Sequence, residues 1–509
     1  MNVAEPTWRH AAERSAAVAL RSGAEDWTYG RLRDGAARVA GGLRAAGVEP
    51  GDRVLLVAPS VPEFVAAYLG IHVAGGVAVT PNVMSTIPEL EYVAADAGCA
   101  MVIAWHELGP APEAVATAMK LPLRRLGADL GGEWDGPAVA DPHPREPGDT
   151  AVILYTSGTT GAPKGAEITE ANLRACAEAF ARVLELSAAD RFGTALPLFH
   201  IFGQAVVVGS VLMAGASVSL MAKFDPTALV ELVPRDGITM LAGVPTMYSA
   251  MVDAAPDAGP ADFADLRLAA SGGASLPGEV IRRFEARYGC AILEGYGLTE
   301  STGAATFNGL HRRRKIGSVG IALPGTEVRI AGEDGGEAKP GQIGEVLVRG
   351  PMVMKGYWNR PEASEHALWD GWLHTGDLGR QDADGDLEIV DRVKDMIVRG
   401  GYNVYPREVE EVLYSHPDLA EVAVIGVPDE HYGEEVGAAI VLRPGGLADP
   451  EELRRWAKET LSAYKVPRLF AFCAELPKGP SGKVLKREID RSALLPLTAS
   501  ERRPERRTG

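Results

Sequence analysis

Apolar positions in the first 150 residues follow two patterns in turn. Between residues 32 and 46 they recur at steps of four and three, which is one face of a helix that Gly47 can end. The run 54–58 is continuously apolar, which is typical of a strand covered on both faces. A helix over 63–74 and a strand over 76–80 are expected next, and apolar runs return at 101–104, 151–155 and 217–220. This rhythm predicts a large, mostly parallel sheet with helices on its faces.

The pattern changes after about residue 317. Short alternating runs at 327–330, 344–349 and 386–390 are separated by turns rich in Gly, Pro and Asp, which predicts antiparallel strands of a smaller β-rich subdomain. From residue 408 onward we expect a helix, strands over 421–427 and 437–442, and a second helix over 450–461. These elements predict a compact α+β domain at the C-terminal end.

One apolar stretch, 201–220, is nearly long enough to span a bilayer. It is interrupted by Gln204, several serines and three glycines. A buried helix, a glycine turn near Gly215 and a buried strand fit this stretch better than the alternative, a membrane span.

Composition and charge narrow the class of protein. The chain has 509 residues, 46% apolar and 23% charged, which is ordinary for two or three globular domains. Its net charge of −17 makes it a poor binder of nucleic acid or an anionic membrane. The four cysteines form no CxxC pair, which argues against a disulfide scaffold or a cysteine zinc site, and the N-terminus lacks the apolar run of a signal peptide. We therefore expect a cytoplasmic protein.

The most informative segment is YTSGTTGAPKG, residues 155–165. It follows a buried strand and precedes a helix that Thr169 can cap. Its glycines let backbone N–H groups turn toward one point, its hydroxyls add donors, and Lys164 adds a cation, so the loop is suited to hold phosphates. It is not a Walker A motif, because the spacing differs. The alternative is a flexible Gly/Thr turn.

This loop resembles the signature of the adenylate-forming superfamily, which contains acyl-CoA synthetases, peptide-synthetase adenylation domains and luciferases. The resemblance extends from about residue 25 to 490 and rests on motifs in the family's order. These are PLFHIFG (197–203), SGGASLP (271–277), GYGLTES (295–301), GEVLVRG (344–350), WLHTGDL (372–378), DRVKDMI (391–397) with GGYN (400–403), and PKGPSGK (477–483).

The resemblance implies an acyl-CoA synthetase that uses ATP, Mg²⁺ and coenzyme A to convert a carboxylic acid to its thioester through an acyl-adenylate. It also implies roles for residues at the matching positions. The phosphates of ATP would be held by Thr156, Ser157, Gly158, Thr159, Thr160, Gly161 and Lys164. The adenine slot would be lined by Gly272, Gly273, Ala274, Gly295, Tyr296 and Gly297. Asp377 and Arg392 would bind the ribose, Glu300 would bind Mg²⁺, and Thr299 would lie beside the α-phosphate.

Lys483 resembles the family's catalytic lysine, which bridges the substrate carboxylate and the α-phosphate. The chain holds only 12 lysines, so the presence of Lys164 and Lys483 inside glycine-rich loops is hard to explain as a coincidence. Lys394 matches the hinge about which the C-terminal domain rotates, and Gly400 and Gly401 would then line the tunnel for the thiol. The expected domains are accordingly 1–393, a mobile domain over 394–495, and a flexible tail over 496–509.

For the acid, the resemblance places the acyl pocket at Phe202, Gly203, Gly243, Val244 and Gly303, with His200 gating or contacting the carboxylate. Members that activate malonate-like diacids usually carry Arg where this chain has Gly295. The small and apolar pocket residues favour a fatty, aryl or alicyclic acid. Coenzyme A is favoured over a carrier protein as acceptor, because the insertion of fatty acyl-AMP ligases is missing. A monomer and a homodimer both remain open.

Two further features need an interpretation: two glutamates that depart from the family's pattern, and a run of aspartates that resembles a calcium loop. Glu167 and Glu170 follow the phosphate loop, where they would either face solvent at a helix N-terminus or weaken ATP binding by repulsion. The second case would favour an enzyme specialised for thioester formation from a supplied adenylate; a regulator without catalysis is the remaining alternative. The run 382–386, DADGD, imitates a calcium loop, but its later positions do not fit, so a hairpin turn is expected.

Overall fold

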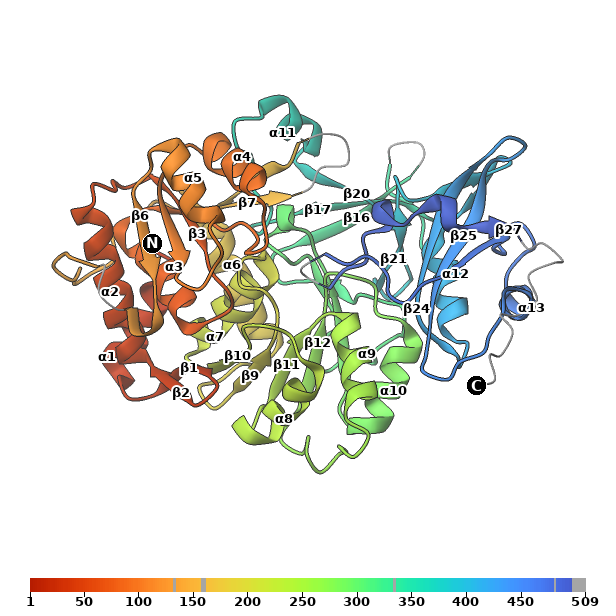
Figure 1. Cartoon of the computed structure of the whole chain (residues 1–509), viewed down its shortest axis with the longest axis horizontal. Helices are drawn as coiled ribbons and strands as arrows, with labels where there is room; N and C mark the ends of the chain where they lie inside the picture. The colour runs from red at the N-terminus through yellow and green to blue at the C-terminus, as the bar shows by residue number, and fades with distance from the viewer. Residues whose placement is uncertain (131–133, 157–161, 333–335, 480–481, 497–509) are drawn as a thin grey trace, which may run out of the picture. The chain divides into compact units, whose positions relative to one another are not determined.

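The computed structural model describes residues 1–130, 134–156, 162–332, 336–479 and 482–496, and these fall into two compact units (Figure 1). The first unit comprises 1–276, 280–375 and 380–388. The second comprises 277–279, 376–379 and the described residues from 389 onward. Within the described parts of the chain, no helix is long and apolar enough to cross a bilayer.

One sheet of the first unit is mostly parallel. Its strands lie in the spatial order β15 (Ile321–Ala322), β14 (Thr306–Phe307), β13 (Ile292–Tyr296), β12 (Leu268–Ser271), β11 (Met240–Gly243), β9 (Arg191–Thr194), β10 (Ser217–Leu220), β1 (Val18–Ser22) and β2 (Glu25–Thr28). The strands from β13 to β1 are parallel to their neighbours, whereas β2, β14 and β15 add antiparallel edges. The carboxyl ends of these six parallel strands therefore lie on one edge of the sheet, where the loops that follow them begin.

A second sheet of the same unit carries the strand before the phosphate loop. Its order is β18 (Gly356–Tyr357), β8 (Lys164–Thr169), β7 (Thr150–Thr156), β4 (Val77–Val79), β3 (Arg53–Val57), β5 (Cys99–Trp105) and β6 (Leu123–Leu126). The strands from β7 to β6 are parallel, and β8 and β18 are antiparallel. Where the sequence predicts one large parallel sheet, the structure has two, because apolar runs mark strands but do not choose their partners.

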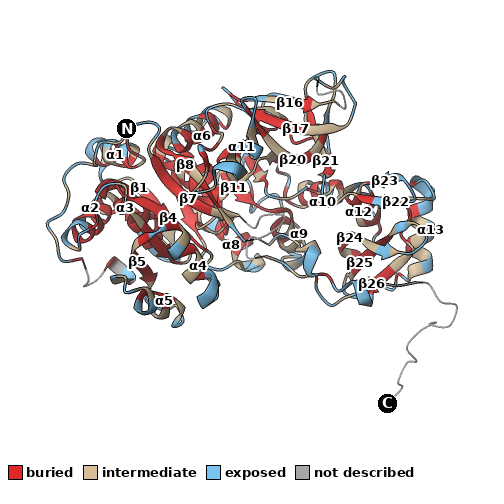
Figure 2. Ribbon diagram, turned by 90° about the horizontal axis from the view of Figure 1, so that it is seen from above, coloured by how far each residue is buried: buried red, intermediate tan, exposed pale blue. Residues whose placement is uncertain are grey.

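Helices cover the two large sheets of the first unit, and the residues of the strands in these sheets are largely buried (Figure 2). They are α1 (Glu5–Arg14), α2 (Tyr29–Ala45), α3 (Pro62–Ala74), α4 (Ile87–Ala97), α5 (Ala111–Met119), α6 (Glu170–Val183), α7 (Ser210–Ala214), α8 (Pro226–Asp236), α9 (Pro245–Ala254), α10 (Gly278–Tyr288) and α11 (Pro361–Ala367), with 3₁₀ turns at Ala128–Leu130 and Thr299–Ser301. The stretch 201–220 forms a π-helical segment, Phe202–Gly209, then α7, a left-handed turn at Gly215, and β10. The prediction of a buried helix, turn and strand is confirmed.

The predicted β-rich subdomain is a third sheet. It consists of β16 (Glu327–Ala331), β17 (Gly344–Arg349), β20 (Trp372–Gln381) and β19 (Leu368–Trp369), with β21 (Leu387–Arg392) paired to β20. The pairs β16–β17 and β19–β20 are antiparallel, as the alternating runs predict.

The second unit is an α+β fold. Its sheet follows the order β23 (Tyr402–Val404), β22 (Ile397–Arg399), β25 (Gly433–Leu442), β26 (Leu469–Phe472) and β27 (Leu495–Pro496), and β24 (Leu419–Asp429) also pairs with β25. Helices α12 (Pro406–Tyr414) and α13 (Pro450–Thr460) bury Leu413 and Leu453 against it, and 3₁₀ turns occur at Lys486–Glu488 and Arg491–Ala493. The predicted elements are present here with slightly longer strands.

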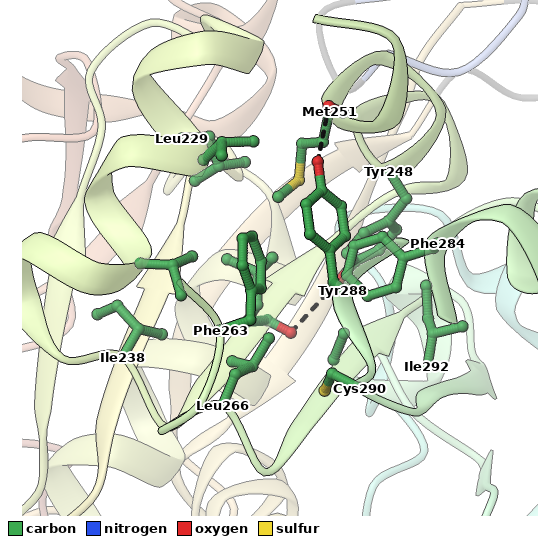
Figure 3. Close-up of a cluster of buried hydrophobic side chains, with 14 of the residues drawn as sticks. Leu229, Ile238, Tyr248, Met251, Phe263, Leu266, Phe284, Tyr288, Cys290 and Ile292 are labelled. Carbon is green, nitrogen blue, oxygen red and sulfur yellow. Dashed lines mark hydrogen bonds between the residues drawn. The ribbon is translucent and has the colours of Figure 1, made fainter. Parts of the chain in front are cut away.

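A tightly packed aromatic cluster supports the loops after β11 and β12 (Figure 3). The hydroxyl of Tyr248 donates to the carbonyl of Ala270 at 2.6 Å, and that of Tyr288 donates to the carbonyl of Met251 at 2.8 Å. The Phe284 ring packs against both tyrosine rings, with centroids about 5 Å away (5.1 and 5.0 Å). Because buried hydroxyls are satisfied and the rings interlock, α9 and α10 are fixed against the strands that bear the site.

Candidate active site

Three glycine-bearing loops meet where β11, β12 and β13 end. The Gly272 N–H donates to the carbonyl of Gly243 at 3.3 Å, and a Cβ at Gly272 would lie 3.6 Å from the carbonyl oxygen of Gly295. Parallel strands place their carboxyl ends on one edge, which is where α/β sheets bind ligands. The adenine-slot residues expected from sequence thus lie on adjacent loops: Gly272, Gly273 and Ala274 follow β12, and Gly295, Tyr296 and Gly297 end or follow β13.

The residues expected to form the acyl pocket lie beside these loops. A Cβ at Gly272 would lie 3.4 Å from the Phe202 ring, and one at Gly273 would lie 3.7 Å from the Val244 side chain. A Cβ at Gly303 would lie 3.3 Å from Ile201 and 3.4 Å from Val206. The structure therefore brings the two predicted sets of residues together, and the side chains at these contacts are apolar.

Two of the predicted residues in this region have local structural roles. Gly203 is packed against the chain, since a Cβ there would lie 2.6 Å from the carbonyl oxygen of Pro197. The ring nitrogen Nδ1 of His200 lies 3.3 Å from the Phe202 N–H, which donates to it. This bond orients the His200 ring at the start of the π-helical segment.

The phosphate loop is the connection of a β-hairpin. Thr156, the last residue of β7, pairs with Lys164, the first of β8, while Ser157, Gly158, Thr159, Thr160 and Gly161 lie outside the described residues. Thr169 caps α6 as predicted, because its hydroxyl accepts from the Asn172 N–H at 3.2 Å. The six-residue strand β8, which the sequence analysis did not anticipate, separates the loop from that helix.

Glu300 lies on the 3₁₀ turn Thr299–Ser301, next to the hairpin. Its Oε1 accepts a hydrogen bond from the Tyr357 hydroxyl at 2.9 Å and another from the Thr156 hydroxyl at 3.3 Å. The ammonium of Lys164 lies 5.1 Å from the centroid of the Tyr357 ring. Three residues expected from sequence are therefore brought together by a fourth, Tyr357, which sequence reasoning missed.

Tyr357 belongs to a segment, residues 351–358, that is bonded to three neighbours. The Asn172 amide donates to the carbonyls of Pro351 and Val353, and the Met354 N–H donates to the carbonyl of Glu300 at 2.8 Å. The Trp358 N–H donates to the carbonyl of Gly165 at 2.8 Å. The segment, here called the strap, thus joins α6, the Glu300 turn and the phosphate hairpin.

The expectation that Glu167 and Glu170 face solvent is wrong. Glu167 accepts from the Lys355 ammonium at 2.8 Å and from the Thr150 hydroxyl, so it ties the strap to the hairpin. Glu170 is 1% exposed, with its Oε1 3.9 Å from Nε of Arg145. Burial raises the pKa of Glu170 to about 7.

The alternative of repulsion toward ATP is not supported either. Thr169 pairs with Thr150 at the start of β7, whereas the phosphate loop follows Thr156 at its end. Six residues of strand separate the two ends, which is roughly 20 Å. Glu170 therefore lies at the wrong end of the hairpin to act on a bound phosphate.

In the second unit, Asp377 and Arg392 form an ion pair. Nε of Arg392 lies 3.1 Å from Oδ1 of Asp377, which is 3% exposed. Lys483, whose side chain is still exposed, belongs to the same charge cluster: its pKa is lowered to about 8, chiefly because nearby protein atoms remove part of its hydration and then because of the Arg392 guanidinium, while Asp377 opposes the shift. The structure thus brings Lys483 to two residues, Asp377 and Arg392, that precede it by 106 and 91 positions in the sequence.

Lys394 lies in a tight turn directly after β21. The N–H groups of Asp395 and Met396 both donate to the carbonyl of Arg392, at 3.1 and 3.2 Å. Burial and the neighbouring Arg392 charge lower the pKa of Lys394. A short turn between two strands is the kind of position where a hinge can be placed.

Gly400 and Gly401 form the two-residue loop between β22 and β23. Both have positive φ, +58° and +84°, which a primed hairpin turn requires and which glycine adopts without strain. The Gly400 N–H donates to the carbonyl of Tyr432 at 2.8 Å. The Tyr432 ring in turn lies 4.1 Å from the guanidinium carbon of Arg399, which is paired with Glu435.

The run DADGD is a turn, as predicted, between β20 and β21. Its tip residue Gly385 has a φ of +80°. The carboxylates of Asp382, Asp384 and Asp386 lie close enough together to suggest a metal site. The ammonium of Lys315 lies 2.6, 2.7 and 3.0 Å from them, so a protein cation already balances this cluster.

Family comparisons identify this arrangement. Residues 7–358 match the AMP-binding enzyme family, and residues 408–483 match the AMP-binding enzyme C-terminal domain. The chain belongs to the AMP-binding enzyme family. It is an adenylate-forming acyl-CoA synthetase, an ATP-dependent acid–CoA ligase that releases AMP.

Individual members are similar over almost the whole chain. A feruloyl-CoA synthase from Amycolatopsis sp is 41% identical over 480 residues, covering 93% of this chain and 96% of that protein. A long-chain-fatty-acid–CoA ligase from Bacillus subtilis is 37% identical, covering 91% and 89%. ATP-bound MatB from Rhodopseudomonas palustris has a TM-score of 0.88 at 34% identity, covering 96% and 98%.

The substrates of this AMP-binding enzyme are ATP, a small carboxylic acid and coenzyme A, and Mg²⁺ is its expected metal. The site fits that metal, because Glu300 offers a carboxylate oxygen, the ligand that a hard cation prefers. Among the described residues, the hydrogen bonds of this carboxylate all fall on Oε1. Bound Mg²⁺ would neutralise phosphate charge and so favour displacement at phosphorus.

Proposed function

We propose that the enzyme activates a hydrophobic carboxylic acid. The proposal is based on the apolar contacts beside the adenine-slot loops. Phe202, Val244, Ile201 and Val206 supply the side chains at these contacts, and Gly303 leaves room between them. Side chains of this kind gain affinity by removing apolar surface from water, and these four described residues have no polar group to pair with a second carboxylate.

Two of the relatives support the same class of acid by their names. Feruloyl and long-chain fatty acyl groups, which appear in the names of two relatives, are both largely apolar. Gly295 stands where diacid-activating members usually carry arginine. We therefore favour a medium to long fatty acid or a bulky aryl or alicyclic acid over a small diacid.

In the first half-reaction, an oxygen of the acid attacks the α-phosphorus of ATP and the bond to pyrophosphate breaks. Both reactants are anions, so the enzyme must reduce their repulsion and hold them in line. We assign Lys164 and the hydroxyls of the phosphate loop to the β- and γ-phosphates, Thr299 to the α-phosphate, and Glu300 to Mg²⁺. Asp377 and Arg392 bind the ribose, and His200 contacts the acyl carboxylate.

We assign Lys483 to the two reacting anions, the carboxylate of the acid and the α-phosphate of ATP, which its ammonium would bridge. Its position in a charge cluster with Asp377 and Arg392 supports this role, because an ammonium there can approach both the ribose and the adjacent phosphate. A compact ammonium fits between two oxyanions as a point charge.

In the second half-reaction, the thiol sulfur of coenzyme A attacks the acyl carbonyl and AMP leaves. We propose that a domain over 394–495 rotates about Lys394 between the two steps, and that the Gly400–Gly401 turn then lines the path of the thiol. The turn before β22 and the glycine loop after it support this assignment.

A panel of acids tests the proposed function. Pyrophosphate release and thioester formation are measured with cinnamic, fatty, alicyclic and dicarboxylic acids, each with and without coenzyme A. We expect thioester from one of the first three classes and none from the diacids. Release of pyrophosphate without thioester would favour a carrier protein as acceptor, and activity confined to the diacids would overturn the hydrophobic pocket.

Lys483→Ala separates the two half-reactions. We expect pyrophosphate release to fall by at least about a hundredfold, as for loss of a transition-state charge contact. Thioester formation from a supplied acyl-adenylate should be retained. Lys478→Ala is the matched control, because Lys478 lies in the same segment but pairs with Glu421 at 2.5 Å. Undiminished adenylation by Lys483→Ala would overturn the assignment.

A further inference from the structure

The hydroxyl of Tyr357 reaches the carboxylate that is assigned to the metal. It donates to Oε1 of Glu300 at 2.9 Å, and the Thr156 hydroxyl donates to the same oxygen at 3.3 Å. Two donors on one oxygen fix the rotation of the carboxylate and leave Oε2 as its remaining ligand atom within the described part of the site. We propose that Tyr357 is a positioning residue, which orients Glu300 for Mg²⁺ and holds the Lys164 ammonium toward the triphosphate.

Tyr357 is suited to this task because it cannot become a competing anion. An ordinary phenol has a pKa of about 10, so at neutral pH the Tyr357 hydroxyl is protonated and can donate to Glu300. A neutral donor leaves the charge of Glu300 available for a cation.

The backbone around Tyr357 is anchored to the elements that it connects. The Met354 N–H donates to the carbonyl of Glu300, and the Trp358 N–H donates to the carbonyl of Gly165, each at 2.8 Å. The Tyr357 N–H donates to the Ser364 hydroxyl at 2.8 Å. Because both the ring and its backbone are held, the distance between the Glu300 turn and the phosphate hairpin is set by the strap.

The ring of Tyr357 makes the second connection. The Lys164 ammonium lies 5.1 Å from its centroid, within the range of a cation–π contact. This contact restricts a flexible side chain before ATP binds, which lowers the entropy cost of binding. One side chain therefore positions both the metal ligand and the phosphate-binding cation.

This inference rests on the proposed role of Glu300, but its test does not require the acid to be known. The binding of a non-hydrolysable ATP analogue with a methylene group between the α- and β-phosphates is measured by calorimetry across a range of Mg²⁺ concentrations. Tyr357→Phe removes the hydroxyl and retains the ring, whereas Tyr357→Leu removes both.

We expect Tyr357→Phe to raise the Mg²⁺ concentration that half-saturates analogue binding by about tenfold, as for a lost hydrogen bond to a charged group. Binding without metal should be unchanged in this variant. Tyr357→Leu should show the same metal effect and should also weaken binding without metal severalfold, because the Lys164 contact is lost. A merely structural residue would weaken binding equally at every Mg²⁺ concentration, and that result would overturn the proposal.

Tyr155→Phe is the matched control. Tyr155 lies next to Thr156, but its hydroxyl donates to Asp96 at 2.7 Å instead of Glu300. The metal dependence of this variant should match that of the unchanged enzyme, and a tenfold shift here would contradict the proposal.

A double-mutant cycle locates the effect on Glu300. If Tyr357 acts through that carboxylate, Tyr357→Phe should have little further effect on metal dependence in a Glu300→Gln background. Full additivity of the two changes would overturn the proposal. Failure of every acid in the panel, with these binding shifts intact, would overturn the proposed substrate class alone.

Discussion

Arg392 and Asp377 lie 3.1 Å apart, between Nε and Oδ1, and they act in opposite directions on the pKa of Lys483. Partial loss of hydration is the main cause that lowers this pKa, to about 8; the guanidinium lowers it further and the carboxylate raises it. The pair that we assign to the ribose therefore also acts on the neighbouring amine. Its two charges shift, in opposite directions, the pH at which this amine loses its own charge.

The first prediction concerns the pH dependence of adenylation. In the role proposed for it, Lys483 must be protonated to reduce the repulsion between the two anions, and with a pKa lowered to about 8 it loses its proton as the pH rises through that value. Above about pH 8, kcat/KM for ATP should fall by about tenfold per pH unit, as for loss of one essential proton. Pyrophosphate release across pH 6.5–9.5 measures this.

Lys483→Arg is the control for that profile. A guanidinium keeps its charge throughout this range, so the variant should be slower but should show no fall above pH 8. If the variant keeps the same fall, the titrating group is not Lys483.

The second prediction follows from the signs of the two neighbours. Arg392→Gln removes a positive charge and should move the midpoint of the pH profile above 8, whereas Asp377→Asn should move it below 8. Both variants will bind ATP less well, so the midpoint and not the rate is the quantity to compare. ¹³C NMR of reductively methylated protein gives the pKa of Lys483 directly, and shifts in one common direction would contradict the charge cluster.

The strands and helices of this protein could be predicted from sequence where apolar residues are regularly spaced. The run 54–58 predicts β3, and the spacing from residue 32 to 46 predicts α2. The assignment of strands to two separate sheets could not be predicted, because β4 pairs with β7, and the paired residues Ala78 and Val152 are 74 positions apart. Partner choice depends on contacts that leave no mark on local periodicity.

The candidate site was predictable where its residues lie in glycine-rich motifs. Tyr357 was missed because β18 is only two residues long and its hydrogen bonds go to other elements, so no local pattern marks it. Glu170 was misjudged for a related reason: a carboxylate at the N-terminus of a helix is usually exposed, but here α6 begins against Arg145. In both cases the decisive neighbours lie far away in sequence.

The third prediction concerns that buried carboxylate. The folded protein holds a proton on Glu170 up to about pH 7, whereas the unfolded chain releases it near 4.5. The free energy of unfolding should therefore fall as the pH rises from 4.5 to 7, because the folded state binds more protons in this window. Glu170→Gln should be about 1–3 kcal/mol more stable than the unchanged protein at pH 8 and nearly equal to it at pH 5.

Urea unfolding at both pH values measures this difference. Glu178→Gln is the control, since Glu178 lies on the same helix in an exposed pair with Arg174. It should change the free energy of unfolding by less than about 1 kcal/mol at either pH. A destabilised Glu170→Gln at pH 8 would mean that Arg145 depends on the charge of the carboxylate.

The fourth prediction concerns the Gly400–Gly401 turn and separates it from the adenylation site. Tyr432 contacts the turn in two ways: its carbonyl accepts from the Gly400 N–H, and its ring would lie 3.1 Å from a Cβ at Gly400. The Arg399 guanidinium lies over the same ring and is held by a buried bidentate pair with Glu435, at 2.5 and 2.8 Å. Tyr432→Leu keeps the ion pair but removes the ring against which the turn is packed.

If the turn lines the path of the thiol, this variant should raise KM for coenzyme A by about five- to tenfold, which corresponds to roughly 1 kcal/mol of lost positioning. Pyrophosphate release should be unaffected, because Lys483 lies outside this cluster. Phe472→Leu is the matched control: Phe472 is an aromatic residue of the same unit, 41% exposed, on β26 and not on the glycine turn. Equal losses in both half-reactions would mean that Tyr432 stabilises the unit as a whole, and an unchanged KM for coenzyme A would remove the turn from the thiol path.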